Sequence, residues 1–120
     1  MESDSVFNYE ELLEQLDGDA DLCAELAADT LADSEERISR VARLLAEEDP
    51  DLESVARDAH ALKGTAGSMC ANDLHDSSTA LLDAARRGSV DETRALAAGT
   101  KAQLDRLQRA FAAHGFVPGG

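Results

Sequence analysis

The chain has 120 residues, which is enough for one compact domain and too few for two. Asp and Glu number 25 against 11 Lys and Arg, and the resulting formal charge of -14 disfavours nucleic acid and anionic membrane surfaces as partners. Aromatic residues make up only 3% while Ala and Leu dominate the apolar set, so helices are favoured over strands.

Turn residues divide the chain into five predicted helices. The first covers about Phe7–Leu16 and ends at Asp17-Gly18-Asp19, where Gly can adopt a positive φ. The second covers about Ala20–Glu48, with apolar residues at steps that keep one stripe along a helix. It stops at Asp49-Pro50, where Asp49 is expected to cap the next helix and Pro50 to be its first residue.

Three more helices follow. The third covers about Asp51–Met69, and the fourth is expected to begin at the N-cap Asn72. It ends at Arg86-Arg87-Gly88, where two cations face the negative end of the helix dipole. The capping box Ser89–Glu92 predicts the start of the fifth helix, which ends at His114-Gly115.

Short connections between amphipathic helices force neighbouring helices to run antiparallel. The sequence therefore predicts an all-α fold, an antiparallel up-down-up-down four-helix bundle with a short extra N-terminal helix. One domain is expected over residues 1–120, with a flexible tail at about 116–120.

Several other classes of site are disfavoured. No apolar run approaches the roughly 20 residues that span a bilayer, and residues 1–4 are acidic where a signal peptide is basic, so a cytoplasmic location is expected. Cys23 and Cys70 lie far apart and outside metal-ligand spacing, which predicts buried free thiols. A ferritin-like metal site would need Glu-x-x-His pairs, and none of the three histidines has Glu three residues before it. No metal site is expected.

The informative stretch is residues 59–69, AHALKGTAGSM. At about 100° per residue, His60 falls on the flank of the third helix, away from the apolar stripe. Ala56 lies one turn before His60, Gly64 one turn after it and Gly67 two turns after it, while Lys63 lies beside it at i+3. The histidine is thus predicted to stand on a nearly bare stretch of helix next to one ammonium group.

The two glycines need an explanation, because each costs a helix about 1 kcal/mol relative to Ala. Either another molecule approaches the backbone near His60, or a neighbouring helix of the bundle packs closely there. A neutral imidazole is a good phosphoryl acceptor near physiological pH. Bare positions at Gly64 and Gly67 would admit a phosphoaspartate of another protein, and Lys63 would stabilise charge on the transferring group.

These residues resemble a known family. His60-Ala61-Leu62-Lys63-Gly64, followed by Ala66-Gly67-Ser68-Met69, is similar to the signature of histidine-containing phosphotransfer (HPt) domains of bacterial multistep phosphorelays. The resemblance covers nearly the whole chain. It implies that His60 is phosphorylated, that Lys63 is its electrostatic neighbour and that Gly64 provides clearance.

The resemblance also implies a function and partners. Such domains accept phosphate from the aspartate of one response-regulator receiver domain and hand it to another, with Mg²⁺ held by the receiver and no cofactor bound by the carrier. A phosphocarrier without ATP binding or kinase activity is therefore expected, acting as a monomer with receivers and a hybrid sensor histidine kinase. Ala56, Arg57, Gly67, Arg86 and Arg87 are the candidate partner-binding residues.

Two positions depart from the family pattern. Cys70 stands where the family often has Gly, so the local turn is expected to differ or a thiol to lie near the partner surface. Leu82, expected opposite His60 on the fourth helix, replaces a Gln or Glu that steadies the imidazole; Ser78, Thr79, Asp83 or solvent are the alternatives. The missing polar partner keeps a second function open, an HPt-like module that binds and inhibits a kinase or receiver without carrying phosphate. A purely structural bundle is the third alternative.

Overall fold

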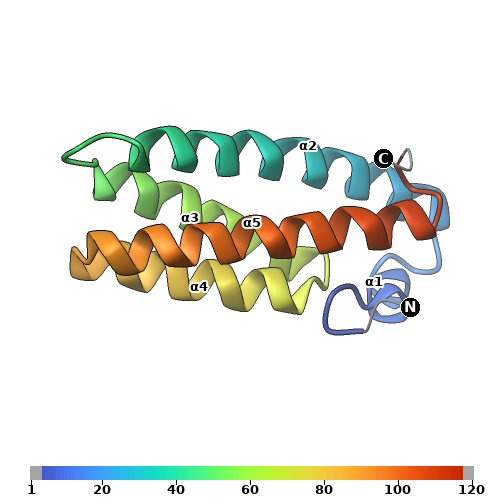
Figure 1. The fold of residues 1–120 in the computed structure, drawn as a ribbon. Helices are drawn as coiled ribbons and strands as arrows, with labels where there is room; N and C mark the ends of the chain where they lie inside the picture. The colour runs from blue at the N-terminus through green and yellow to red at the C-terminus, as the bar shows by residue number, and fades with distance from the viewer. Residues whose placement is uncertain (1–3, 118–120) are drawn as a thin grey trace.

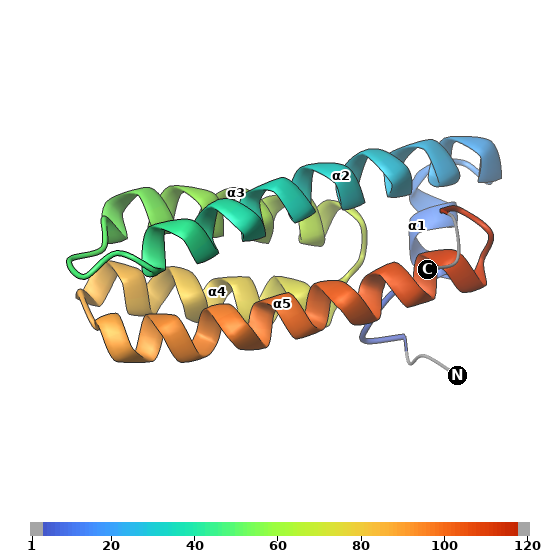
Figure 2. The ribbon, with the colours of Figure 1, turned by 45° about the horizontal axis from the view of Figure 1, so that its top comes forward.

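The computed structural model describes residues 4–117, and these residues form five helices and no strand (Figure 1). The helices are α1 (Tyr9–Gln15), α2 (Ala20–Leu45), α3 (Leu52–Ser68), α4 (Asn72–Arg87) and α5 (Val90–Ala113). Consecutive helices from α2 to α5 run antiparallel, and α5 packs back against α2 (Figure 2). The short helix α1 lies across the end of the bundle where α2 begins and α5 ends. The predicted all-α, up-down-up-down bundle with an extra N-terminal helix is confirmed.

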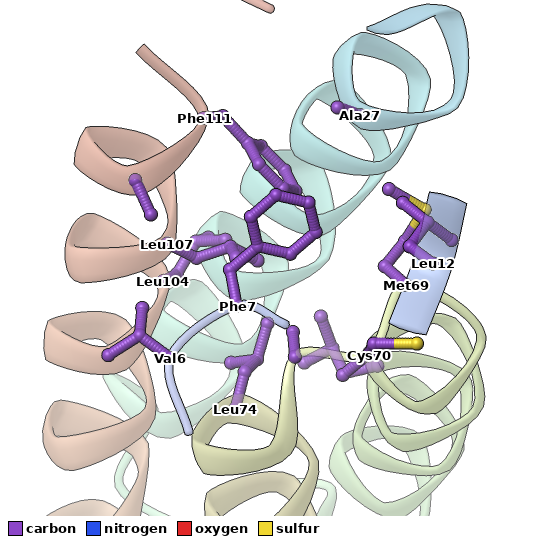
Figure 3. Close-up of a cluster of buried hydrophobic side chains, with 14 of the residues drawn as sticks. Val6, Phe7, Leu12, Ala27, Met69, Cys70, Leu74, Leu104, Leu107 and Phe111 are labelled. Atoms are coloured by element: carbon purple, nitrogen blue, oxygen red, sulfur yellow. The ribbon is translucent and has the colours of Figure 1, made fainter. Parts of the chain in front are cut away.

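The core consists of two apolar clusters along the bundle axis. The first lies at the end covered by α1, and its members come from the N-terminal segment and from each of the helices α1 to α5. Its largest members include Phe7, Leu12, Leu74, Leu107 and Phe111, which Figure 3 shows close together. The second lies toward the other end and is built from α2, α3 and α4, with Leu96 and Ala97 of α5 packed against it. Both cysteines are buried free thiols, as predicted. No helix in the described part of the chain is long and apolar enough to cross a membrane.

The start of α4 is capped by a distant segment rather than by its own residues. Ala71, not the predicted Asn72, is the N-cap residue, and its side chain makes no cap hydrogen bond. Instead, the amide of Asp73 donates to the carbonyl of Ser5 at 2.7 Å, and the Asn8 amide donates to the Cys70 carbonyl at 3.0 Å. The N-terminal segment thereby satisfies backbone groups at the α3–α4 turn that would otherwise lack partners.

The connection between α2 and α3 also differs from the prediction. Helix α2 ends at Leu45 and not at Glu48. The Arg94 guanidinium donates to the carbonyls of Leu45 at 3.1 Å and Glu47 at 3.0 Å, and so supplies partners for carbonyls at this helix end. The cap of α3 is Asp51, not Asp49, and its carboxylate accepts from the Ser54 amide at 3.1 Å. Pro50 therefore precedes the helix instead of forming its first residue.

Two predictions at α5 also needed correction or completion. Ser89 is the N-cap residue of α5, but the predicted capping box does not form: Ser89 makes no side-chain cap hydrogen bond, and Glu92 instead pairs with Arg87 at 2.8 Å. After α5, Phe116 and Val117 of the predicted tail pack against the first cluster. The rest of that tail, 118–120, lies outside the described residues.

Cys70, at the turn between α3 and α4, has the backbone conformation that favours glycine. The amides of Cys70 and Ala71 donate to the carbonyls of Gly67 and Ala66, the hydrogen-bond pattern that ends a helix with a left-handed residue. Cys70 has a φ of 57°, whereas Gly88 supplies the corresponding residue after α4 with a φ of 76°. The left-handed conformation costs a non-glycine residue about 1 kcal/mol. The Cys70 thiol is buried and burial raises its pKa, so it is no reactive group on the surface.

Candidate functional site

The outward face of α3 presents His60. Val55, Ala59, Leu62 and Ala66 point into the bundle and are fully buried, which leaves His60 exposed on the opposite flank. This orientation follows from the helical period, because His60 lies about 100° from the buried Ala59. The sequence prediction of an exposed histidine on the flank of the third helix is confirmed.

His60 lines an open groove of about 760 Å³ between α3 and α4. The groove is apolar where Leu52, Ala56 and Ala85 line it, and charged where it is bounded by three side chains, Glu53, Arg57 and Arg86. The sequence prediction included Ala56, Arg57 and Arg86 but missed Leu52, Glu53 and Ala85. The sequence could have placed Glu53 near the site, because it lies two turns before His60 on the same face of the helix.

The two glycines of α3 have different surroundings. A Cβ added at Gly64 would meet no atom within 4 Å, so no neighbouring helix requires glycine at this position. A Cβ at Gly67 would lie 3.5 Å from Cδ2 of His75 on α4, an ordinary contact distance. Close packing within the bundle therefore explains neither glycine, and the helix surface beside His60 is open to an approaching molecule.

The His60 imidazole makes no hydrogen bond with any side chain or backbone group among the described residues. Leu82 is 2% exposed and belongs to the second core cluster, so it offers neither a polar group nor an exposed surface. Ser78 is fully buried, and its hydroxyl has no partner among the described residues. The hydroxyl of Thr79 donates to the His75 carbonyl, and Asp83 is exposed. Of the alternatives to Leu82, solvent is the one that agrees with this arrangement.

The cations near the groove are not equivalent. Arg57 donates to the Ser54 hydroxyl at 2.9 Å and lies 3.9 Å from the Glu53 carboxylate. Arg87 pairs with Glu92 at the α4–α5 turn and does not line the groove. The other two predicted cations, Lys63 and Arg86, form no ion pair or hydrogen bond with any of the described residues.

A buried carboxylate, missed by the sequence prediction, attaches α3 to α2. Asp58 is 4% exposed, and its carboxylate accepts two hydrogen bonds from Arg40, at 2.7 and 2.8 Å, and one from Arg37 at 3.1 Å. The hydrogen bonds from Arg40 lower the pKa of Asp58, and Arg37 adds to this effect against the cost of burial. The signal in the sequence was an acid within the apolar stripe of the helix, two residues before His60.

The other two histidines lie outside the groove. His75 Nδ1 lies 3.1 Å from the Asp76 carboxylate. The His114 ring stacks on Phe116 with centroids 5.4 Å apart, next to the first core cluster. The described residues contain no group of three or more His, Cys, Asp or Glu side chains that could hold a metal ion.

Comparisons with known proteins agree with this geometry. Residues 25–110 match the model of the Hpt domain family. The structure is similar to that of a histidine-containing phosphotransfer protein from maize, with a TM-score of 0.79, 21% identity, and 89% of this chain and 78% of that chain covered. A rice structure named for the same kind of protein has a TM-score of 0.77 and 21% identity over 85% of this chain and 76% of that one. No curated protein matches the chain.

Proposed function

Since the chain belongs to the Hpt domain family and has a phosphotransfer role in a phosphorelay, we propose that His60 carries the phosphoryl group. In this proposal His60 accepts it from the aspartyl phosphate of one receiver domain and passes it to the aspartate of another. The observation that carries the proposal is the exposed imidazole beside Gly64. The helix surface is open there, and no described residue forms a hydrogen bond with the ring.

The transfer exchanges one bond to phosphorus for another. A lone pair of the neutral imidazole attacks the phosphorus while the bond to the aspartate oxygen breaks, and the carboxylate leaves with that electron pair. The second ring nitrogen keeps its proton. Lys63 lies one turn from His60 on the same helix, and its ammonium would stabilise the negative charge on the equatorial oxygens.

The groove supports docking of a second protein rather than binding of a small molecule. Its apolar wall, formed by Leu52, Ala56 and Ala85, would contact an apolar patch of the receiver, while Arg57 and Arg86 would meet the acids around the receiver's aspartate. The receiver would hold the Mg²⁺ that neutralises its own acidic pocket. The chain would act as a monomeric carrier in the cytoplasm, binding no ATP, with receivers and a hybrid sensor kinase as its partners.

Incubation with a phosphorylated receiver domain and Mg²⁺ tests this proposal. We expect the intact mass of the chain to rise by one phosphoryl group, with a label that is labile in acid, stable in alkali and mapped to the peptide containing His60. If the chain binds the receiver and inhibits it but never gains the label, it is the non-carrying interaction module instead.

A bulkier side chain at Gly64 should slow the transfer without loosening the fold. Gly64→Gln places a side chain in the open space beside His60, where the incoming phosphoaspartate has to come into line, and we expect transfer to slow by roughly tenfold or more. The same change should raise the free energy of unfolding by about 0.5–1 kcal/mol, because Gln is a better helix former than Gly. Stopped-flow transfer and urea denaturation measure the two effects.

Gly99→Gln is the matched control for this variant. Gly99 is also an exposed helical glycine with nothing within 4 Å of an added Cβ, but it lies on α5. It should give the same gain in stability and leave the transfer rate unchanged. Transfer at the wild-type rate in Gly64→Gln would show that clearance is not the role of Gly64.

A further inference from the structure

Two side chains, His60 on α3 and Arg86 on α4, line the groove from opposite walls. Helices α3 and α4 are antiparallel, and the proximity of Gly67 to His75 shows which levels of the two helices face each other. Counting back from Gly67 along α3 and forward from His75 along α4 places His60 opposite Leu82 and Ala56 opposite Arg86. Side chains in a helix lean toward its N-terminus. His60 therefore leans toward the level of Arg86, and Arg86 leans back toward the level of His60, in agreement with their positions in one groove.

Of the two arginines that line this groove, Arg86 is the one that forms no ion pair or hydrogen bond with the described residues. Arg57, on the other wall, donates a hydrogen bond to Ser54 and pairs with Glu53, and Arg87 pairs with Glu92. Arg86 is exposed and has no ion-pair or hydrogen-bond partner in the part of the chain that the structure describes. It can therefore bind an anion in the groove without first breaking an internal contact.

We propose that Arg86 is a phosphoryl-binding residue: its guanidinium donates hydrogen bonds to the phosphoryl oxygens on His60, from the side opposite Lys63. This inference rests on the proposed function for its biological meaning. Two adjacent N–H groups of a guanidinium match two oxygens of a phosphoryl group, which a single ammonium cannot do. Arg86 lies one turn further along α4 than Leu82, whose apolar side chain has no hydrogen-bond donor to offer the phosphoryl group. No covalent bond to Arg86 forms or breaks.

The ionisation of the phosphoryl group itself tests this assignment. Potassium phosphoramidate can load the histidine without any receiver: its N–P bond breaks, ammonia leaves and a new N–P bond forms on the imidazole. The ³¹P resonance that is missing from the loaded His60→Gln variant belongs to His60. Its chemical shift is then followed against pH in the wild type, Arg86→Gln, Arg86→Lys and Arg43→Gln.

A cation in contact with the phosphoryl group favours its dianion, so the loss of Arg86 should move the titration midpoint upward by roughly half a pH unit. Arg86→Lys keeps the charge and should retain most of the wild-type midpoint. Arg43→Gln removes the same charge from an exposed position on α2, outside the groove, and should leave the midpoint unchanged.

Equal midpoints in the wild type and Arg86→Gln would overturn the inference, and so would an equal upward shift in Arg43→Gln, because the effect would then reflect net charge alone. The chemical donor keeps this result separate from the proposed function. A shift confined to Arg86→Gln would stand even if no receiver labelled His60.

Discussion

The His60→Gln variant should lose all labelling by a phosphorylated receiver while remaining folded. Glutamine has a similar polar side chain but no nucleophilic nitrogen, so no bond to phosphorus can form. His60 is exposed and has no hydrogen-bond partner among the described residues, so its replacement should change the free energy of unfolding by less than about 0.5 kcal/mol. Intact-mass measurement reports the label and urea denaturation reports the fold.

The two other histidines are the controls. His75→Gln and His114→Gln remove imidazoles that lie outside the groove, one beside Asp76 and one stacked on Phe116, and both variants should be labelled like the wild type. A label that persists in His60→Gln and disappears in one of the controls would move the phosphorylated residue away from the groove.

The Asp58→Ala variant should lower the free energy of unfolding by about 2–3 kcal/mol. Removing one partner of a buried ion pair costs about 3–5 kcal/mol, and the value here is reduced because the side chains of Arg37 and Arg40 remain 29% and 42% exposed. The variant leaves two guanidinium groups at the α2–α3 interface without their shared acceptor. Urea denaturation at pH 7 measures the loss.

Two further variants separate the buried interaction from a surface one. Asp33 also pairs with Arg37, at 2.9 Å, but its side chain is 44% exposed and it lies one turn from Arg37 on the same helix. Asp33→Ala should therefore cost only about 0.3–0.5 kcal/mol. Asp58→Asn keeps the shape of the side chain and should fall between the two alanine variants. Equal losses in Asp33→Ala and Asp58→Ala would show that burial adds nothing to this interaction.

The stabilisation by Asp58 should also depend on pH. Its pKa in the folded protein is lowered, first by the Arg40 hydrogen bonds, whereas the unfolded chain has an ordinary Asp pKa near 3.9. The unfolded state therefore takes up a proton first as the pH falls. The stability difference between wild type and Asp58→Asn should be complete above about pH 5 and should shrink as the pH drops through 4 toward the folded pKa. A difference that stayed constant down to pH 3 would contradict this linkage.

The main parts of the site were accessible from the sequence because they lie on one helix. The orientation of His60, Lys63, Gly64 and Gly67 around α3 depends only on the helical period, which is the same in every α-helix. The exposure of His60 then follows from the apolar residues that have to face the core. The likeness of this segment to a known signature further indicated which of the three histidines to choose.

The ends of the helices were predicted less well, because several are decided by residues far away in the chain. Nothing near Ala71 indicates that the carbonyl of Ser5 will accept from the amide of Asp73. At the end of α2, the Leu45 carbonyl likewise accepts from Arg94, which lies 49 residues later in the chain. At α5 the predicted N-cap residue Ser89 is correct, but Glu92 pairs with the nearby Arg87 and the capping box does not form.

By itself, the sequence determined that five amphipathic helices form a bundle and that one of them presents an exposed histidine beside a bare stretch of backbone. Only the tertiary structure decided what surrounds that histidine: the groove with Ala85 and Arg86, the inward position of Leu82 and the attachment of α3 through Asp58. The reason is geometric. Positions around one helix follow from its period, whereas contacts between helices depend on their axial shift and rotation, which the packing of the whole core sets.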